Sequence, residues 1–219
     1  MLSKVTKPFI IAEIGNNHEG NFNTALKLIK KASYCGADAV KFQTFKPDLY
    51  VNGKEKKRLK LLKKFSLSNE EFFKLSKYAK KKKLKFISTP FDIPSAVFLN
   101  KIVDYFKVSS GDNNYYELID KVLSFKKKTI ISTGLLDKKS LDKLINYLLK
   151  NNIQKNKLNI LHCVAAYPTK PENINLSRIT YIKKKFKINT GFSDHTIGSL
   201  SSIIATILGA KIIEKHFTL

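Results

Sequence analysis

Hydrophobic and polar positions follow two different periods along this chain. Short runs rich in β-branched and aromatic residues are typical of buried strands, and stretches with an apolar residue every three or four positions are typical of amphipathic helices. The predicted strands are 9–15, 38–45, 85–91, 105–110, 129–134, 158–165, 189–194 and 211–217. The pattern therefore predicts eight strands, each separated from the next by helical sequence.

Several helices between these strands can be placed from their apolar stripes and their capping residues. One stripe consists of Phe22, Ala25, Leu26, Ile29 and Ala32, and another lies within 200–208. Ser68 and Glu71 form the pattern of a capping box, which predicts a helix over 69–82. The segment 46–68 is long for a connection, and we interpret it as a loop with a short basic helix.

Strict alternation of apolar strands and helices indicates a parallel sheet covered by helices. Eight such units favour an α/β fold of the (β/α)8 TIM-barrel type over an open, doubly wound sheet. A chain of 219 residues can bury one sizeable core, so we expect a single domain over residues 1–219. Because the sequence stops two residues after the eighth predicted strand, we expect the last helix of the barrel to be absent.

The composition, at 43% hydrophobic and 11% aromatic residues, is that of a globular protein and not of a disordered one. No run reaches the roughly 18 apolar residues that a membrane span needs, and the N-terminus lacks the pattern of a cleaved signal peptide. Cys35 and Cys163 are too few for a disulfide framework, and we expect both to be buried thiols. These features predict a cytoplasmic protein without a membrane partner.

The formal net charge of +24 raises the question of a nucleic-acid partner. The lysines occur in runs, such as 80–83 and 183–185, that lie at the ends of predicted helices and are not interleaved with aromatic residues. Arg58 and Arg178 are the only arginines, although arginine is the residue that best recognises phosphate and guanine. A lysine-rich solvated surface explains the charge, and we do not expect nucleic acid to be the main partner.

In such barrels the reactive groups collect at the C-terminal ends of the strands. The polar residues at the predicted ends are Glu13, Asn16, Asn17, His18, Lys41, Gln43, Ser88, Thr89, Lys107, Ser109, Ser110, Asp112, Ser132, Thr133, His162, Tyr167, Ser193, Asp194, His195, Glu214 and His216. The set contains acids, bases and hydroxyl groups, so it favours an enzyme.

Two lysines in this set lie on strands, where a charge facing the interior is costly unless an anion pairs with it. Lys41 and Lys107, together with Ser110, Ser132 and Ser193, predict a phosphate cradle of two point charges and three hydroxyl donors. The alternative is that both lysine side chains extend from the strand ends into solvent.

Two histidines follow the seventh predicted strand and lie in the eighth. Neighbouring strands of a barrel would bring His195 and His216 within reach of one ion, and two imidazoles suit a transition metal such as Mn, Zn or Fe. Glu13 and Asp112 are candidate supplementary acids for that site. The alternative is that each histidine is a hydrogen-bonded core residue.

A series of motifs resembles the sialic acid synthase family along essentially the whole chain. These motifs are IAEIGNNHEGN at 11–21, VKFQTF at 40–45, STPFD at 88–92, KVSSGD at 107–112, ISTG at 131–134, CVAAYPTKPENINL at 163–176, GFSDHTIG at 191–198 and GAKIIEKHFTL at 209–219.

The resemblance implies a transferase of sialic acid biosynthesis, with a (β/α)8 barrel and a divalent metal, usually Mn²⁺. Its reaction condenses phosphoenolpyruvate with an N-acetylated amino sugar, either N-acetylmannosamine or a 2,4-diacetamido hexose, and gives a nine-carbon sialic-type acid and phosphate. By resemblance, the metal ligands are His195 and His216, and the catalytic residues are Glu13, Gln43 and Asp112. The implied substrate contacts are Lys41, Thr89, Lys107, Ser110, Ser132, Tyr167 and Ser193.

The sequence departs from the family at its C-terminus. Full-length members are homodimers and continue with the last barrel helix, a linker and an antifreeze-like domain that reaches the sugar of the partner subunit. No such segment follows Leu219, so the resemblance implies weaker sugar binding and lower stability for residues 1–219. Two alternatives remain: a related phosphoenolpyruvate-dependent synthase that uses a phosphorylated aldose, and an inactive truncated remnant or lysine-rich binding protein.

Overall fold

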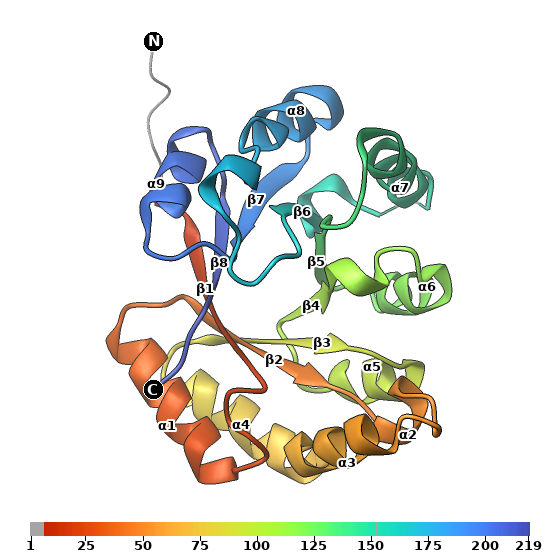
Figure 1. Cartoon of the computed structure of the whole chain (residues 1–219), viewed down its shortest axis with the longest axis vertical. Helices are drawn as coiled ribbons and strands as arrows, with labels where there is room; N and C mark the ends of the chain where they lie inside the picture. The colour runs from red at the N-terminus through yellow and green to blue at the C-terminus, as the bar shows by residue number, and fades with distance from the viewer. Residues whose placement is uncertain (1–6, 152) are drawn as a thin grey trace.

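The computed structural model describes residues 7–151 and 153–219. Eight parallel strands pair in chain order and close into a barrel (Figure 1). The strands are β1 (Phe9–Gly15), β2 (Ala39–Thr44), β3 (Lys85–Pro90), β4 (Tyr105–Val108), β5 (Lys128–Ser132), β6 (Leu158–Cys163), β7 (Asn189–Asp194) and β8 (Ile212–His216). The predicted (β/α)8 barrel is confirmed, and most of the strands end one or two residues earlier than the sequence pattern suggested.

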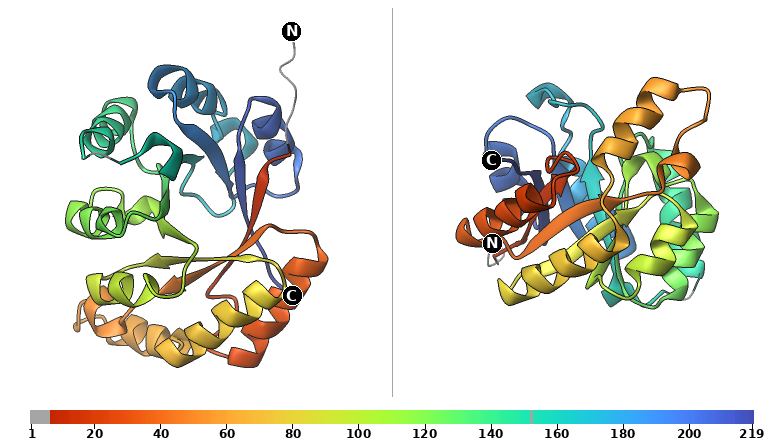
Figure 2. Two further views of the ribbon diagram at one scale, coloured as in Figure 1. Left: turned by 180° about the vertical axis from the view of Figure 1, so that it is seen from behind. Right: turned by 90° about the horizontal axis from the view of Figure 1, so that it is seen from below.

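Helices surround the barrel on its outer side (Figure 2). They are α1 (Phe22–Tyr34), α2 (Pro47–Tyr50), α3 (Lys56–Phe65), α4 (Asn69–Lys81), α5 (Ile93–Leu99), α6 (Tyr116–Ser124), α7 (Lys138–Lys150), α8 (Ser177–Phe186) and α9 (Leu200–Ile207). Short 3-10 helices lie in the connections, at Ser110–Asp112 (η1), Lys155–Lys157 (η2) and Pro171–Asn173 (η3). In the described part of the chain, no helix is both long and apolar enough to cross a bilayer.

Local sequence explains where several helices begin. At α4, the Ser68 hydroxyl accepts a hydrogen bond from the Glu71 backbone N–H, and the Glu71 carboxylate accepts one from the Ser68 backbone N–H, so the predicted capping box is confirmed. The Asn21 side chain caps α1 in the same way, by accepting from the Thr24 N–H. The segment 46–68 contains the predicted basic helix, α3.

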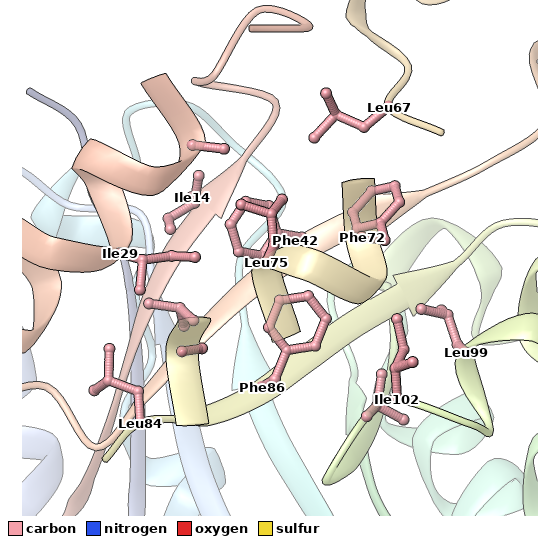
Figure 3. Packing of buried hydrophobic residues seen from close by; sticks show 14 of the residues in the cluster. Ile14, Ile29, Phe42, Leu67, Phe72, Leu75, Leu84, Phe86, Leu99 and Ile102 are labelled. Atoms are coloured by element: carbon pink, nitrogen blue, oxygen red, sulfur yellow. The ribbon is translucent and has the colours of Figure 1, made fainter. Parts of the chain in front are cut away.

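The apolar residues form one layer inside the barrel and larger layers between the barrel and its helices. The inner layer consists of Ile11, Ala39, Ile87, Ile130, Leu161 and Ile212. Outside the first three strands, Phe42 and Phe86 stack on each other and pack against Leu75 and Phe72 of α4 (Figure 3). This packing holds the strand ends in fixed relative positions.

The barrel closes between its first and last strands. Phe9 pairs with Ile212 at the start of this seam, and Glu13 pairs with His216 at its end. Beyond the strands, the Phe217 N–H donates to the Glu13 carbonyl at 2.9 Å. Residues from the two ends of the sequence therefore lie side by side at the C-terminal mouth of the barrel.

The two cysteines differ in exposure, contrary to the expectation that both would be buried. Cys163 is buried at the end of β6, whereas Cys35 is exposed. Cys35 directly follows α1 as its C-cap residue, at the outer end of that helix, where no further layer covers it.

Candidate functional site

Above the apolar layer of the barrel interior lies a layer of charged and hydroxyl groups. Side chains two positions apart on a strand face the same way, so each residue of this polar layer lies two positions after a residue at the level of the apolar layer. On β7 the residue at that level is a glycine. Glu13 follows Ile11, Lys41 follows Ala39, Lys107 follows Tyr105, Ser193 follows Gly191 and Glu214 follows Ile212. All five lie on the C-terminal side of the apolar layer, which is the side of a (β/α)8 barrel that holds its reactive groups.

Four of these side chains form a buried network of alternating charge. The Lys41 ammonium lies 2.7 Å from a carboxylate oxygen of Glu13, and the Lys107 ammonium lies 2.9 Å from one of Glu214. Glu214 joins the two pairs, because its other oxygen is 4.0 Å from the Lys41 nitrogen. The Ser193 hydroxyl donates to Glu214 at 2.8 Å.

The burial of Lys41 and Lys107 decides whether their ammonium groups face the barrel interior or extend into solvent. Lys41 is 4% exposed and Lys107 is 3% exposed, so the alternative that their ends reach solvent is wrong. Both face the interior and are paired, as a buried ammonium group requires. Their counterions in the described chain are the carboxylates of Glu13 and Glu214, which the predicted phosphate cradle did not include.

The two glutamates of the network differ in acidity. Burial alone would raise the pKa of Glu214, but the charges of Lys107 and Lys41 outweigh burial and lower that pKa from 4.5 to about 2. For Glu13 burial prevails over the charge of Lys41, so the pKa of Glu13 is raised above 4.5. Burial would lower the pKa of Lys41, yet the two carboxylates raise it. Glu13 is thus the carboxyl group of the network better suited to take up a proton.

Four predicted hydroxyl groups lie near this network with different contacts. Thr89 accepts a hydrogen bond from the Lys41 ammonium at 3.3 Å. Burial raises the pKa of the Cys163 thiol. Hydrogen bonds with the Ser110 and Ser193 hydroxyls act in the opposite direction, so both hydroxyls lie beside this thiol. The Ser132 hydroxyl is buried without a hydrogen-bond partner among the described residues, and so it is available to a ligand.

Gln43 and Asp112, two predicted catalytic residues, are held by neighbours outside the charge network. The Gln43 side-chain carbonyl accepts from the Asn16 amide at 2.9 Å. Asp112 lies in η1, and the Ser109 hydroxyl donates to its carboxylate. Within residues 7–151 and 153–219, no hydrogen bond or ion pair joins Asp112 to the lysines or to the histidines of the site.

His195 and His216 lie together at the mouth of the barrel, as predicted. Their ring centroids are 5.5 Å apart, and the Tyr167 ring stands 4.0 Å from that of His195 and 5.5 Å from that of His216. Burial is the main cause that lowers the pKa of both histidines, to about 4 for His216. Both rings are therefore neutral near pH 7.

The histidine pair has the chemistry of an incomplete metal site. The Nδ1 atom of His195 donates to the Val164 carbonyl at 2.7 Å, which orients the ring and leaves Nε2 as a ligand. A neutral imidazole is the form that binds a transition metal. Among the described residues, no group of three or more His, Cys, Asp or Glu side chains is placed to hold a metal. Neither Glu13 nor Asp112 thus completes the site in this conformation, and a metal here would keep positions open for substrate or water.

The main residue that sequence reasoning missed is Glu214. It stood among the strand-end residues without a role, yet it links both lysines of the charge network. A signal was present in the sequence: Glu214 and His216 are two positions apart on one strand, so both face the same side. The pairing with Lys107 could not be predicted, because it joins opposite sides of the barrel.

Comparisons with protein families and relatives agree along the length of the chain. The family model described as the NeuB family matches residues 28–219. An uncharacterized protein of Methanocaldococcus jannaschii is 42% identical over 96% of this chain and 62% of its own length. The N,N'-diacetyllegionaminic acid synthase of Campylobacter jejuni is 38% identical over 97% of this chain and 68% of its own length. Human N-acetylneuraminate-9-phosphate synthase is 32% identical over 96% and 62%.

A solved structure supports the same comparison. The N-acetylneuraminic acid synthetase of Leptospira borgpetersenii, in complex with citrate, superposes with a TM-score of 0.90 at 32% identity. The match covers 100% of this chain and 77% of that one. This chain thus spans roughly two thirds of the length of the curated relatives it matches.

Proposed function

The chain belongs to the NeuB family, and from this membership and the buried charge network we propose that it is a sialic-type acid synthase or the barrel portion of one. The proposed reaction condenses phosphoenolpyruvate with an N-acetylated amino sugar and gives a nine-carbon acid and phosphate. Relatives named as legionaminic acid and N-acetylneuraminate-9-phosphate synthases support a sugar-acid product. A cytoplasmic location and a homodimer remain predictions.

The observation that carries the proposal is a pair of buried ammonium groups beside an open histidine pair. Phosphoenolpyruvate bears several negative charges in a small volume, and Lys41 and Lys107 supply two cations at the closed end of the site. Added negative charge next to Glu13 favours protonation of this carboxyl group, whose pKa is already raised. Proton uptake by Glu13 would free Lys41 to face the ligand.

The residues of the chain then have distinct roles in the bond changes. The enol carbon of phosphoenolpyruvate attacks the aldehyde carbon of the sugar, and a C–C bond forms between two substrates held in fixed positions. The aldehyde oxygen takes the proton that Glu13 acquired on binding, which leaves Glu13 as a carboxylate. Water adds to the resulting oxocarbenium carbon and transfers a proton to the Glu13 carboxylate. The C–O bond to phosphate then breaks, the new hydroxyl gives its proton to the departing phosphate, and the carbon becomes the keto group of the product. Lys41 and Lys107 stabilise the negative charge of the leaving phosphate.

His195 and His216 would hold a divalent metal, which we propose to be Mn²⁺. When bound, such an ion supplies Lewis-acid activation of the sugar aldehyde. Tyr167, which is 69% exposed and packs beside both imidazoles, is placed to contact the sugar. Thr89, Ser110, Ser132 and Ser193 remain proposed phosphoenolpyruvate contacts, and Gln43 and Asp112 remain proposed neighbours of the reacting carbons.

Phosphate release from phosphoenolpyruvate tests the proposal. The assay uses the chain with Mn²⁺ and a panel of N-acetylmannosamine, its 2,4-diacetamido analogues and arabinose 5-phosphate. We expect release with an N-acetylated sugar, and its loss in His195→Ala and in Lys107→Met. Lys128→Met is the matched control, because Lys128 is an exposed residue of the neighbouring strand.

Two results would contradict the assignment of residues 1–219 as a complete sialic-type acid synthase. Release with arabinose 5-phosphate alone would assign the chain to the synthases of phosphorylated aldoses. A folded chain that binds Mn²⁺ but releases no phosphate with any sugar would show that residues 1–219 are not a synthase by themselves.

A further inference from the structure

The two histidines at the mouth of the barrel lie just beyond the residues that pair their strands with each other. Pairing between β7 and β8 ends with Asp194 opposite Lys215. His195 directly follows the first of these residues, and His216 directly follows the second. Because the ladder between the described strands stops one residue short of the histidines, side chains must set the distance between the two imidazoles.

Asp194 has a buried carboxylate that binds groups on the outer side of the barrel wall. Ser193 faces the interior, so the next residue, Asp194, faces outward, and it is 1% exposed. One carboxylate oxygen accepts hydrogen bonds from the Thr196 N–H at 2.8 Å and from the Thr196 hydroxyl at 2.7 Å. The other oxygen accepts from the Ser202 hydroxyl at 2.6 Å, in the first turn of α9. Asp194 thus ties the end of β7 to α9 and to the residue that follows His195.

Lys215 extends this tie from β8 to β7. Its ammonium group donates to the Asp194 carboxylate at 3.0 Å and to the Thr196 carbonyl at 2.8 Å. The Asp194 side chain is fully buried and that of Lys215 is 32% exposed, so the ion pair is largely shielded from water. These contacts form a bridge that holds the residues before and after His195 to the strand that carries His216.

Each histidine also has an anchor on another part of the barrel. The His195 carbonyl accepts a hydrogen bond from the Thr169 N–H at 2.9 Å, in the connection between β6 and α8. On the other strand, the residue after His216 is Phe217, whose N–H donates to a carbonyl of β1 at 2.9 Å. The two anchors hold the histidines to different neighbours, and the bridge spans the interval between them.

A metal site needs its ligands held within about 0.5 Å of the productive geometry by the groups around them. Hydrogen bonds between an ammonium group and a carboxylate are shorter and stronger than those between neutral groups, so a charged bridge suits this task.

We propose that Asp194 and Lys215 are positioning residues for the histidine pair. They bind neither metal nor substrate, and they keep His195 and His216 at the spacing that one divalent ion requires. The inference rests on the metal pair of the proposed function and adds the residues that set its geometry.

Binding of Mn²⁺ alone, followed by electron paramagnetic resonance, tests the proposal without a catalytic assay. Asp194→Asn keeps the shape of the side chain and removes its charge. Lys215→Met keeps most of the chain length and removes the ammonium group. The thermal midpoint of each variant shows whether it is folded at the temperature of the binding measurement.

Asp92→Asn is the matched control. Asp92 is 5% exposed and is the N-cap residue of α5, just after β3, which is not a neighbour of β7 or β8 in the barrel. Its carboxylate accepts hydrogen bonds from the N–H and the hydroxyl of Ser95, in the first turn of α5, and from the Lys46 N–H. It therefore resembles Asp194 in burial and in its contact with the next helix.

We expect Asp194→Asn and Lys215→Met each to raise the dissociation constant of Mn²⁺ by at least about tenfold, as the loss of groups that orient metal ligands typically does. Asp92→Asn should bind Mn²⁺ as the unmodified chain does, although it lowers the thermal midpoint. If Asp194→Asn does not fold, Lys215→Met decides, because the Lys215 side chain is partly exposed.

The contrary results are distinct. Unchanged Mn²⁺ affinity in the folded variants would overturn the inference and leave the proposed function standing. An equal loss of affinity in Asp92→Asn would also overturn it, because the effect would then follow stability and not the bridge. If the unmodified chain binds no Mn²⁺, or if His195→Ala binds it equally well, the proposed metal pair fails and this inference falls with it.

Discussion

Substitution of Glu214 is the most demanding test of the charge network, because its carboxylate pairs with both Lys107 and Lys41. In Glu214→Gln the shape is kept and the negative charge is lost, so Lys107 loses its counterion and Lys41 keeps only Glu13. A pKa lowered from 4.5 to about 2 corresponds to about 3 kcal/mol, since each pKa unit is about 1.4 kcal/mol. Removal of one partner of a buried ion pair typically costs about 3 to 5 kcal/mol, which agrees with this value.

The measurement is urea denaturation at pH 7 and then across the acid range. We expect the free energy of unfolding to fall by about 3 kcal/mol at pH 7. Because the folded pKa of Glu214 is depressed, its contribution is present above pH 4.5 and is lost as the pH falls through about 2. The Gln variant should lack this part of the acid dependence, and added phosphoenolpyruvate should restore part of its stability through the unpaired lysines.

Glu117→Gln is the control for this experiment, since Glu117 is an exposed residue of α6 and should change stability by no more than about 0.5 kcal/mol. If Glu214→Gln lowers the free energy of unfolding by less than about 1 kcal/mol, the reasoning is refuted. So small a loss would mean that Glu214 and its lysines are not fully removed from water. An unchanged slope between pH 4.5 and 2 would refute it independently.

Two further predictions concern the scaffold. An added Cβ at Gly191 would stand 2.4 Å from the Ile212 carbonyl oxygen and 2.6 Å from Leu161 Cδ2. Gly191→Ala should therefore lower the free energy of unfolding, measured in urea, by about 1 to 3 kcal/mol. Gly53→Ala, where nothing lies within 4 Å, should be near neutral, and equal effects would contradict the steric argument. Ser68→Ala removes the capping box of α4 and should cost about 1 kcal/mol; an unchanged thermal midpoint would show that the cap does not contribute.

The fold could be predicted because each strand and helix leaves a local pattern in the sequence. Buried strands read as short apolar runs, α4 begins at a recognisable capping box, and eight alternations of strand and helix have few compact solutions. Local patterns give strand ends less well, since β4 stops at Val108 and the chain turns into η1 where the sequence still favours extended structure.

The site could be predicted in its position and only partly in its contacts. The end of each strand is a local property, so the residues that gather at the mouth could be named in advance. Which of them pair depends on distances across the barrel: Lys107 on β4 meets Glu214 on β8, and these residues are 107 positions apart. For the same reason Asp112 could not be separated beforehand from the residues of the charge network.

The seam between β1 and β8 has a consequence for how this molecule acquires its site. Asn17 and Phe217 are 200 positions apart and share a hydrogen bond, so the seam requires the closure of almost the whole chain. Contacts of such high sequence separation form late, because a long loop must be ordered before they contribute. Glu13 and His216 face each other only across this seam. A partly folded barrel would hold most of the hydrophobic core and none of the complete site, so ligand binding should report the last step of folding.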